Sequence, residues 1–157
     1  MTDITVRVID CHIAVQTDTS FRFLILKRSN ETVCPNHWQC VTGKIEQGEL
    51  PYIAAIREVK EETGLRPVRM WTVDTVNFFY EHKVNQLNVV PVFGMIVDNF
   101  DVSLSNEHVD FKWLSIDQAL DSLIWRKQID GLREFNRMLI TETEKNSFLE
   151  IDIDINI

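Results

Sequence analysis

One short segment constrains this chain more than any other stretch of its sequence. Residues 51–64 read PYIAAIREVKEETG, in which Pro51 suits the first turn of a helix and Gly64 suits the position just past its end. We therefore expect a helix over residues 51–63. That helix carries three glutamates within five positions, and such crowding of like charge is destabilising unless positive charge lies among them.

The three glutamates, Glu58, Glu61 and Glu62, are expected to share one face of the helix. Because successive helical residues advance by about 100°, Glu62 lies about 40° from Glu58 on one side and Glu61 about 60° on the other. Ala54 and Ala55 lie on the same arc and are small enough for a ligand to approach closely. The pattern predicts a row of carboxylates open to a ligand; a solvated acidic face is the plainer alternative.

The opposite face of this helix is expected to pack into the core through Tyr52, Ile53, Ile56 and Val59. Arg57, four residues before Glu61, can hold a glutamate in position. Oxygen-rich clusters are the ligands that hard cations such as Mg²⁺ and Mn²⁺ prefer, and the preceding loop GKIEQGE adds backbone carbonyls and Glu49. These details favour a divalent-metal site over a plain acidic surface.

Composition and charge exclude several classes of protein. A net charge of −8 argues against binding to a nucleic-acid polymer, which needs clustered basic residues, but it allows an anionic small molecule whose charge divalent ions offset. No apolar run reaches the roughly 20 residues that span a bilayer, and the start MTDITVRVID lacks the features of a secretory signal. We expect a cytoplasmic protein with no membrane partner, forming a single domain over residues 1–157, with its three cysteines reduced.

Hydrophobic alternation and turn residues predict a mixed α/β protein in which strands dominate the first two thirds. Strands are expected over residues 4–16, 21–28, 40–45, 70–81, 87–98 and 111–116. Helices are expected over residues 51–63, 115–125 and 127–141. Residues 29–39 are polar and include Pro35, so they predict a loop, and Pro91 within a strand pattern predicts an edge or a bulge.

The C-terminal stretch FLEIDIDINI, residues 148–157, alternates apolar and polar side chains. This alternation predicts an added edge strand or a strand that pairs across a homodimer. As a chain terminus, the tail from residue 145 onward is equally compatible with a frayed segment.

Residues 43–65 together resemble the Nudix box. Gly43 is followed after five residues by Glu49 and after seven more by Arg57, from which the run REVKEETGL continues without departing from the pattern. The resemblance implies an αβα sandwich with a mixed β-sheet, in which residues 43–65 form a loop–helix–loop. It also implies Mg²⁺-dependent hydrolysis of a nucleoside diphosphate linked to another group.

The resemblance also implies roles for individual residues. The Gly43 carbonyl with Glu58, Glu61 and Glu62 looks like a set of ligands for Mg²⁺, for which Mn²⁺ is a substitute. Arg57 looks like the residue that orients these glutamates for catalysis, supported by Glu49. Two or more divalent ions at such a site would bridge phosphate oxygens, lower the pKa of a bound water and neutralise charge on the leaving pyrophosphate.

Residues outside the box complete the expected site. The resemblance implies that the catalytic base is a glutamate of the box, Glu58 or Glu61, or one from a later loop. Glu107, in the segment SNEHVDFKWL, is the later candidate for the base or an additional metal ligand, with a surface glutamate as the alternative. Four residues are expected to bind substrate: Lys27, Arg28, Trp38 and Lys44. The lysines and the arginine would hold phosphates and Trp38 would stack on a flat base, the alternatives being exposed strand-end charges and a tryptophan that closes the core edge.

The sequence also resembles one branch of the family. The segments HWQCVTGKIEQGE (37–49), EHVDFKWL (107–114) and IWRKQIDGLREF (124–135) are similar to the dihydroneopterin triphosphate diphosphatase branch, described also as acting on dATP. This implies cleavage between the α- and β-phosphates of a pteridine or purine nucleoside triphosphate, giving a monophosphate and pyrophosphate. A dinucleoside polyphosphate or nucleotide sugar is an alternative substrate. A non-catalytic ligand-binding module is a further alternative, which the intact carboxylates disfavour.

Overall fold

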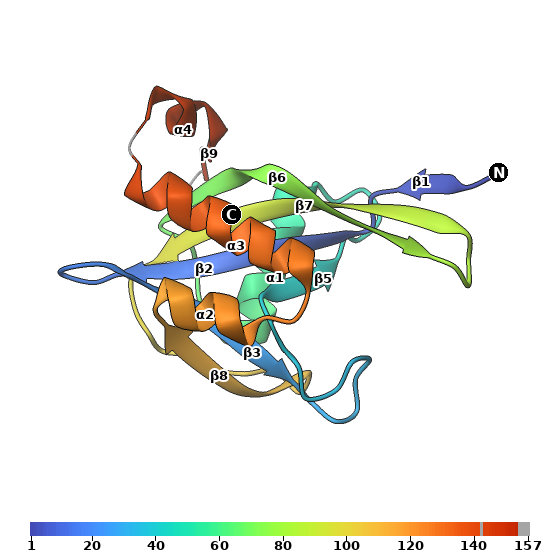
Figure 1. Ribbon diagram of the computed structural model, residues 1–157, viewed down its shortest axis with the longest axis horizontal. Coiled ribbons are helices and arrows are strands. Elements are labelled where there is room, and N and C mark those ends of the chain that lie inside the picture. Colours follow the sequence, from blue (N-terminus) through green and yellow to red (C-terminus); the bar gives the residue numbers. More distant parts are fainter. Residues whose placement is uncertain (142, 154–157) are drawn as a thin grey trace.

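A nine-stranded mixed sheet forms the centre of the protein in the computed structural model, which describes residues 1–141 and 143–153 (Figure 1). The main strand order is β4-β3-β2-β7-β6-β9, and β8 pairs with β3, β5 with β2 and β1 with β7. The strands are β1 (Asp3–Thr5), β2 (Val8–Gln16), β3 (Phe21–Arg28), β4 (Trp38–Gln39), β5 (Val41–Lys44), β6 (Arg69–Glu81), β7 (Gln86–Val97), β8 (His108–Leu114) and β9 (Glu150–Ile151). The helices are α1 (Pro51–Thr63), α2 (Ile116–Ser122), α3 (Arg126–Ile140) and α4 (Glu144–Leu149).

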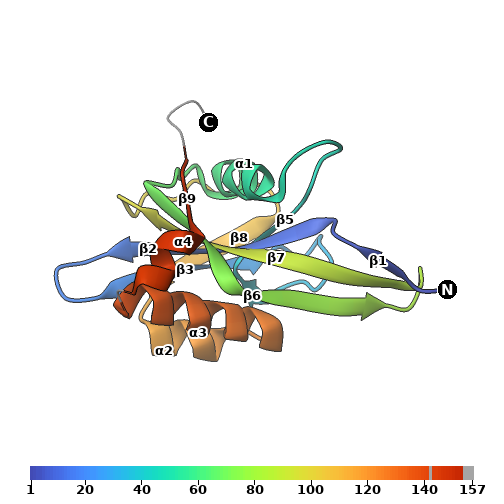
Figure 2. The ribbon, with the colours of Figure 1, turned by 90° about the horizontal axis from the view of Figure 1, so that it is seen from above.

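Helices cover both faces of the sheet, so the protein has three layers. Seen from above, α1 lies on one face while α2 and α3 lie on the other (Figure 2). At the centre, β2 runs parallel to β7 and antiparallel to both β3 and β5. The sheet is buried on both faces there, and the side chains from Ile9 to Val15 are accordingly all buried.

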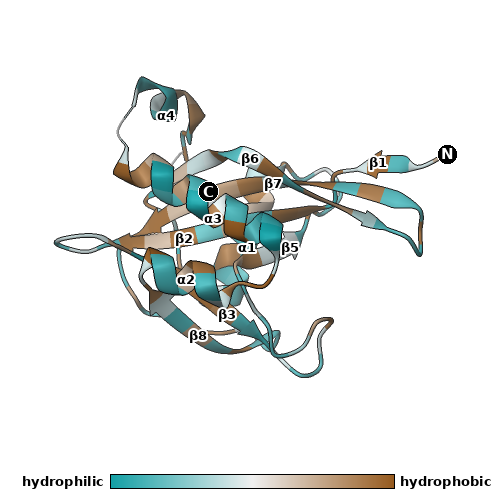
Figure 3. Ribbon diagram, viewed as in Figure 1, coloured by the Kyte–Doolittle hydropathy of each residue, from teal (hydrophilic) through white to brown (hydrophobic). Residues whose placement is uncertain are grey.

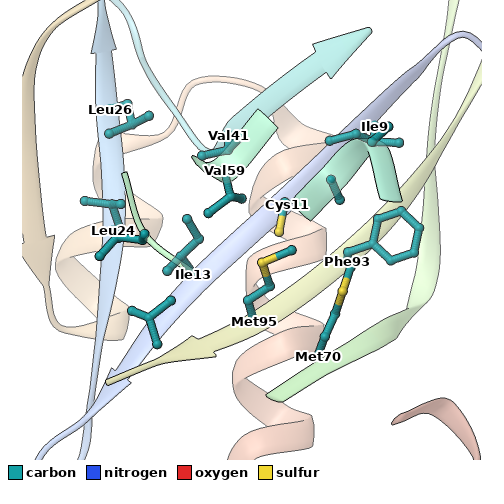
Figure 4. Close-up of a cluster of buried hydrophobic side chains, with 14 of the residues drawn as sticks. Ile9, Cys11, Ile13, Leu24, Leu26, Val41, Val59, Met70, Phe93 and Met95 are labelled. Carbon is teal, nitrogen blue, oxygen red and sulfur yellow. The ribbon is translucent and has the colours of Figure 1, made fainter. Parts of the chain in front are cut away.

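The strand β2 divides its side chains between two hydrophobic clusters. Ile9, Cys11 and Ile13 belong to the cluster beneath α1, where Val59 meets them (Figure 4). Ala14 belongs to the other cluster, beneath α2 and α3. Successive side chains of a strand point to opposite faces, so one strand anchors both helical layers.

Aromatic rings dominate the cluster on the α3 side. The ring of Phe135, fully buried on α3, lies 6.3 Å from the ring of Phe23 and 6.2 Å from that of Trp71. Rings at this spacing and tilt attract one another beyond their burial of apolar area. They fix α3 across strands β3 and β6, which lie on either side of β2 and β7 in the strand order.

The helix α1 has the bounds that Pro51 and Gly64 predict. Gly64 adopts a left-handed backbone conformation with φ 74°, and its N–H donates to the Lys60 carbonyl at 2.9 Å. A residue with a side chain is strained at this φ, so glycine ends the helix cleanly. The loop between β7 and β8 is tied to the helix end by the Ser103 N–H, which donates to the Thr63 carbonyl at 2.8 Å.

The structure differs from the sequence expectations in five places, one of which is β8, expected over residues 111–116 but formed by His108–Leu114. The strand predicted over residues 4–16 is broken between β1 and β2, and the helix predicted over 115–125 ends at Ser122. A two-residue strand, β4, forms at the end of the predicted loop. The helix α4 was not predicted and includes Phe148 and Leu149 of the alternating tail; only Glu150 and Ile151 add an edge strand, on β6, and residues 154–157 lie outside the described residues.

The bulge that Pro91 predicted is present. The register between β6 and β7 shifts between Thr72 and Val76, and Val76 lies opposite Pro91. Beyond this bulge, β6, β7 and β1 form an arm that extends from the body of the protein (Figure 1) and along which apolar and polar bands alternate (Figure 3). Phe78 and Tyr80 are half exposed on this arm. In the described part of the chain, no helix is long and apolar enough to cross a bilayer.

Several polar side chains are buried where β2 faces α3. Asp10 is only 4% exposed, and Asn77 of β6 donates its amide Nδ2–H to Asp10 Oδ2 at 2.8 Å. Burial raises the pKa of Asp10 to about 6, although the Asn77 hydrogen bond acts in the opposite direction. Burial likewise lowers the pKa of His12 to about 3, so its imidazole is neutral at physiological pH.

The three cysteines are free, as expected of reduced thiols. Cys11 and Cys40 are buried, while Cys34 is half-buried in the loop between β3 and β4. Burial is the largest cause that raises the pKa of both Cys11 and Cys40.

Candidate active site

The site begins where the sheet passes directly beneath a carboxylate of α1. Gly43 lies in β5 opposite Ile9 of β2, and a Cβ atom at Gly43 would lie 2.1 Å from Cδ of Glu58. Real Cβ atoms do not approach other atoms so closely, so a residue with a side chain here would displace the Glu58 carboxylate. Glycine is therefore needed for the close contact between the backbone of β5 and the acidic helix.

Arg57 organises the carboxylates around it. Its guanidinium forms a bidentate pair with Glu49, with Nε–Oε1 at 2.8 Å and Nη2–Oε2 at 2.9 Å, and also donates to the Lys44 carbonyl at 2.8 Å. The remaining nitrogen, Nη1, donates to Glu58 at 2.9 Å and to Glu61 at 3.3 Å. The prediction that Arg57 orients the glutamates agrees with this geometry, since planar guanidinium groups fix carboxylates in direction as well as position.

These contacts and burial shift the pKa values of the groups involved. The hydrogen bond from Arg57 holds the pKa of Glu49 below its usual value, and its bond with Glu49 is the main cause that raises the pKa of Arg57. Burial raises the pKa of Glu58, and this outweighs the opposing effect of Arg57. The loop before α1 is thus held by a permanently charged guanidinium rather than left mobile.

The helix buries a different face from the one its sequence predicts. Ala54 and Ala55 are fully buried against the sheet, so the prediction that they would line an open, ligand-facing arc is wrong. Glu58 and Glu62 lie on this same buried face, with exposures of 9% and 3%. The small alanines let the helix lie close to the sheet, so the side chains of the two glutamates are buried between α1 and its neighbours instead of extending into solvent.

The expected apolar face is only partly inserted. Val59 is fully buried, Tyr52 and Ile56 pack against the same cluster while half-buried, and Ile53 is half-buried. Glu61 is exposed. The acidic residues therefore divide into a buried pair, Glu58 and Glu62, and an exposed member that faces Arg57.

Glu62 is held by residues from the segment before β8. His108 Nδ1 lies 2.6 Å from Glu62 Oε2, and the Ser105 hydroxyl donates to the same oxygen at 2.8 Å. Burial pushes the pKa of Glu62 upward, but the hydrogen bonds from His108 and Ser105 outweigh it and the pKa is lowered. Glu62 is thus kept as a carboxylate despite its burial.

Glu107, the candidate for an additional metal ligand or the catalytic base, lies beside this pair. The negative charge of Glu62 is the largest cause that raises the pKa of Glu107, while His108 and Arg28 act in the opposite direction. The backbone fixes its place, because the Glu107 N–H donates to the Ser105 hydroxyl at 3.3 Å and its carbonyl accepts from the Ser29 N–H at 3.0 Å.

The donor set suits a hard divalent cation. Within residues 1–141 and 143–153, no three His, Cys, Asp or Glu side chains converge on one point closely enough to hold an ion unaided. Mg²⁺ commonly binds through one or two carboxylates and keeps water and substrate phosphate oxygens as its other ligands, so a complete protein cage is not required. The predicted ligands Gly43, Glu58, Glu61, Glu62 and Glu107 supply oxygen atoms only, which fits this ion and Mn²⁺.

The predicted substrate-binding residues lie at separate places, and two of them, Arg28 and Lys44, are adjacent to residues of the acidic site. Arg28 pairs with His108 across β3 and β8, which places it next to the acidic segment, and its Nε donates to Thr32. Lys44 is exposed at the end of β5, and its carbonyl is the one bound by Arg57.

Lys27 and Trp38 pair across β3 and β4. Trp38 is half-buried and packs against the α3-side cluster, while the Nζ atoms of Lys112 and Lys27 lie 4.7 Å and 6.0 Å from its ring centre. The tryptophan therefore closes the core edge, which was the alternative to base stacking, and two lysine side chains lie over its ring.

Three residues of the site were not assigned a role from sequence. His108, Ser105 and Gln39 all contact the Glu62 region, and Gln39 Nε2 lies 3.3 Å from His108 Nε2. His108 stood within the segment EHVDFKWL that carried the family resemblance, so its histidine was the available signal. Its partner Glu62 lies in α1, far away along the chain, which is why no local pattern revealed the pair.

Comparison with known proteins decides the family. The NUDIX domain matches residues 7–135, which include the whole cluster around Arg57. The chain belongs to the Nudix hydrolase family. This confirms the family and the αβα fold predicted from residues 43–65, and with them an enzyme of the class that acts on pyrophosphate bonds.

Two relatives show the range of activities near this Nudix protein. It is 30% identical over 119 residues to a bis(5'-nucleosyl)-tetraphosphatase of Caenorhabditis elegans, covering 74% of this chain and 84% of the relative. It is 29% identical over 119 residues to the dihydroneopterin triphosphate diphosphatase of Escherichia coli K12, covering 68% of this chain and 77% of the relative. A crystal structure of C. elegans Ap4A hydrolase has a TM-score of 0.70 at 24% identity, covering 87% of this chain and 98% of that one.

A further relative is much longer than this Nudix protein. The chain is 35% identical over 121 residues to a Myxococcus xanthus protein named octanoyltransferase, of whose length it spans only 30%. The match extends over 72% of this chain. The chain therefore spans less than a third of the protein to which that name applies.

Proposed function

We propose that this protein is a Mg²⁺-dependent pyrophosphohydrolase that cleaves the α–β phosphoanhydride of a pteridine or purine nucleoside triphosphate, releasing a monophosphate and pyrophosphate. The observation that carries the proposal is the Arg57 network, which fixes Glu49, Glu58 and Glu61 beside Gly43. Such a network positions carboxylates without neutralising them all, as a site for hard cations and phosphates requires.

We assign different roles in this reaction to different residues of the chain. Glu58, Glu61, Glu62 and the Gly43 carbonyl would hold the divalent ions, which supply Lewis-acid activation of water and neutralise phosphate charge. Arg57 fixes the positions of three surrounding carboxylates through ion pairs. Glu107, whose pKa the Glu62 carboxylate raises, is the candidate to accept the proton of the attacking water.

The triphosphate assignment is supported by one relative and by a group of cations at Trp38. Lys27 of β3 and Lys112 of β8 gather at Trp38 of β4, on the face of the sheet that α2 and α3 cover, and could bind phosphate oxygens. The E. coli relative is named for a triphosphate of this kind. Dinucleoside tetraphosphates form a second candidate class, because the C. elegans, mouse, rat and pig relatives are named bis(5'-nucleosyl)-tetraphosphatases.

A substrate screen tests the proposal. Purified protein with Mg²⁺, and separately with Mn²⁺, would be assayed against dihydroneopterin triphosphate, dATP, diadenosine tetraphosphate and nucleotide sugars, with products separated by ion-exchange chromatography. Pyrophosphate and a monophosphate from the first two substrates support the proposal. Turnover of diadenosine tetraphosphate alone would favour the second candidate, and turnover of nucleotide sugars alone would refute both.

Two further measurements locate the chemistry. Reaction in ¹⁸O-labelled water followed by mass spectrometry shows which phosphorus is attacked, and label in the monophosphate is expected for attack at the α-phosphorus. The variant Glu58→Gln should lose activity by at least about 100-fold, because it removes a charge that the ions require. Glu144→Gln, an exposed glutamate on α4, is the matched control and should retain activity.

A further inference from the structure

Glu62 and His108 form a pair that is almost wholly removed from water. Their side chains are 4% and 1% exposed, and His108 Nδ1 lies 2.6 Å from Glu62 Oε2. The Ser105 hydroxyl donates to that same oxygen at 2.8 Å. Neither of these two contacts uses Glu62 Oε1, and the Glu107 carboxyl group lies within hydrogen-bonding reach of Glu62 as well.

The far side of the imidazole determines which nitrogen carries the proton. Gln39, which is 4% exposed in β4, places its amide Nε2 3.3 Å from His108 Nε2. An amide nitrogen can only donate, so His108 Nε2 must accept. The proton of a neutral imidazole then lies on Nδ1, facing Glu62, because the partner of one ring nitrogen sets the state of the other.

The backbone around His108 is fixed to the same elements. The Ser105 N–H donates to the Glu62 carbonyl at 3.4 Å, and the His108 N–H donates to the Ser105 carbonyl at 3.3 Å. The Glu107 carbonyl accepts from Ser29 at the end of β3. His108 therefore cannot leave Glu62 without also disturbing Glu107, its neighbour in the chain.

We propose that Gln39 and His108 are positioning residues for Glu62: Gln39 holds His108 as its Nδ1–H tautomer, and that proton fixes Glu62 Oε2 so that Oε1 is presented to a divalent ion. The step from Oε1 to an ion rests on the proposed metal-dependent function. The tautomer and the order Gln39, His108, Glu62 rest on geometry alone.

A purely structural role for the pair makes a different prediction. A buried pair that only supports the fold would lower the melting temperature when broken and leave the affinity for a cation unchanged among the folded molecules. A positioning role predicts a loss of cation affinity, since removing a residue that orients a metal ligand typically weakens binding about 10- to 100-fold.

Two substitutions of His108 separate these roles. His108→Leu removes the donor to Glu62, whereas His108→Asn keeps an N–H at nearly the position of Nδ1. Mn²⁺ affinity of each folded variant would be measured by electron paramagnetic resonance of the free ion. We expect His108→Leu to lose about 10- to 100-fold in affinity and His108→Asn to stay within a few-fold of the unchanged protein. His82→Leu, an exposed histidine in the β6–β7 turn, is the matched control and should change nothing.

The tautomer is tested directly by ¹⁵N NMR of the protein labelled at histidine. For His108 we expect a pyrrole-like Nδ1 and a pyridine-like Nε2, and Gln39→Leu should weaken this preference, because only the Glu62 carboxylate then selects the Nδ1–H form. If His108→Leu does not fold, Gln39→Leu still tests the arrangement, with a smaller expected loss of Mn²⁺ affinity.

Either of two results would overturn the inference. One is unchanged Mn²⁺ affinity in folded His108→Leu; the other is a proton on Nε2 in the unchanged protein. Failure of the proposed function is distinguishable from both: the unchanged protein would then bind no Mn²⁺ and turn over no substrate, while the NMR spectrum would still report the tautomer.

Discussion

Replacing Asp10 by asparagine should change how the stability of this protein depends on pH. Asp10 is buried beside Asn77, and burial raises its pKa in the folded state to about 6 from a reference value of 3.8. Between these two values the unfolded chain ionises Asp10 while the folded protein keeps it protonated. The favourable contribution of the protonated group is therefore complete below about pH 3.8 and is lost as the pH rises through about 6.

The size of the effect follows from the two pKa values. They differ by about 2 units, and each unit corresponds to about 1.4 kcal/mol, so ionised Asp10 lowers the free energy of unfolding by about 3 kcal/mol relative to the protonated form. Asparagine has nearly the same shape and no charge. The stability of Asp10→Asn relative to the unchanged protein should therefore rise by about 3 kcal/mol between about pH 4 and about pH 7.5.

Urea unfolding followed by circular dichroism at a series of pH values measures this difference. Other titrating groups are common to both proteins and cancel in the comparison, and Asp18→Asn in the exposed β2–β3 turn is the control. A stability difference between Asp10→Asn and the unchanged protein that does not vary with pH would refute the reasoning. It would show that Asp10 gains enough solvation or pairing in the folded state to ionise normally.

Three further outcomes are expected at the acidic site. Gly43→Ala should fold with a stability loss of about 1 kcal/mol, measured by urea unfolding, but should lose most activity because its Cβ displaces the Glu58 carboxylate; normal kcat would contradict this. Arg57→Lys keeps the charge but loses the bidentate pair with Glu49, so kcat should fall about 10- to 100-fold with little change in melting temperature, and an unchanged kcat would show that the fork geometry is unimportant. Mg²⁺ at about 100 times its dissociation constant should stabilise the protein by about 2.7 kcal/mol, seen as a higher Tm that EDTA reverses and that Glu58→Gln diminishes; a melt independent of Mg²⁺ would count against the metal site.

Local chemistry made much of the fold predictable. Pro51 and Gly64 bound α1 because one lacks an N–H that the first turn does not use and the other tolerates a left-handed conformation. The alternation of apolar and polar residues predicted the bounds of β3, β6 and β7 closely, because successive side chains of a strand point to opposite faces of the sheet. The break between β1 and β2 was missed because the alternation continues through Val6 and Arg7, although β1 pairs with β7 alone in the described structure.

The gathering of carboxylates around Arg57 was predictable from the sequence, and their orientation was less so. The fixed spacing from Gly43 to Glu62 identified the carboxylates, but a polar residue is expected on the exposed face of a helix unless it has a buried partner. Glu62 has such partners in Ser105 and His108, which a separate segment brings to it. Tertiary contacts of this kind leave no periodic trace in sequence, so the burial of Glu58 and Glu62 could not be anticipated.

The distribution of the three thiols has a practical consequence. Alkylating reagents attack the thiolate, and Cys11 and Cys40 are both inaccessible and, through burial, shifted away from ionisation. A maleimide dye added to the folded protein should therefore attach at Cys34 alone, without replacement of the other two. Cys34 lies in the loop that leads from Arg28 to Trp38, so the fluorescence of a dye there would report on the surroundings of that loop in the otherwise native chain.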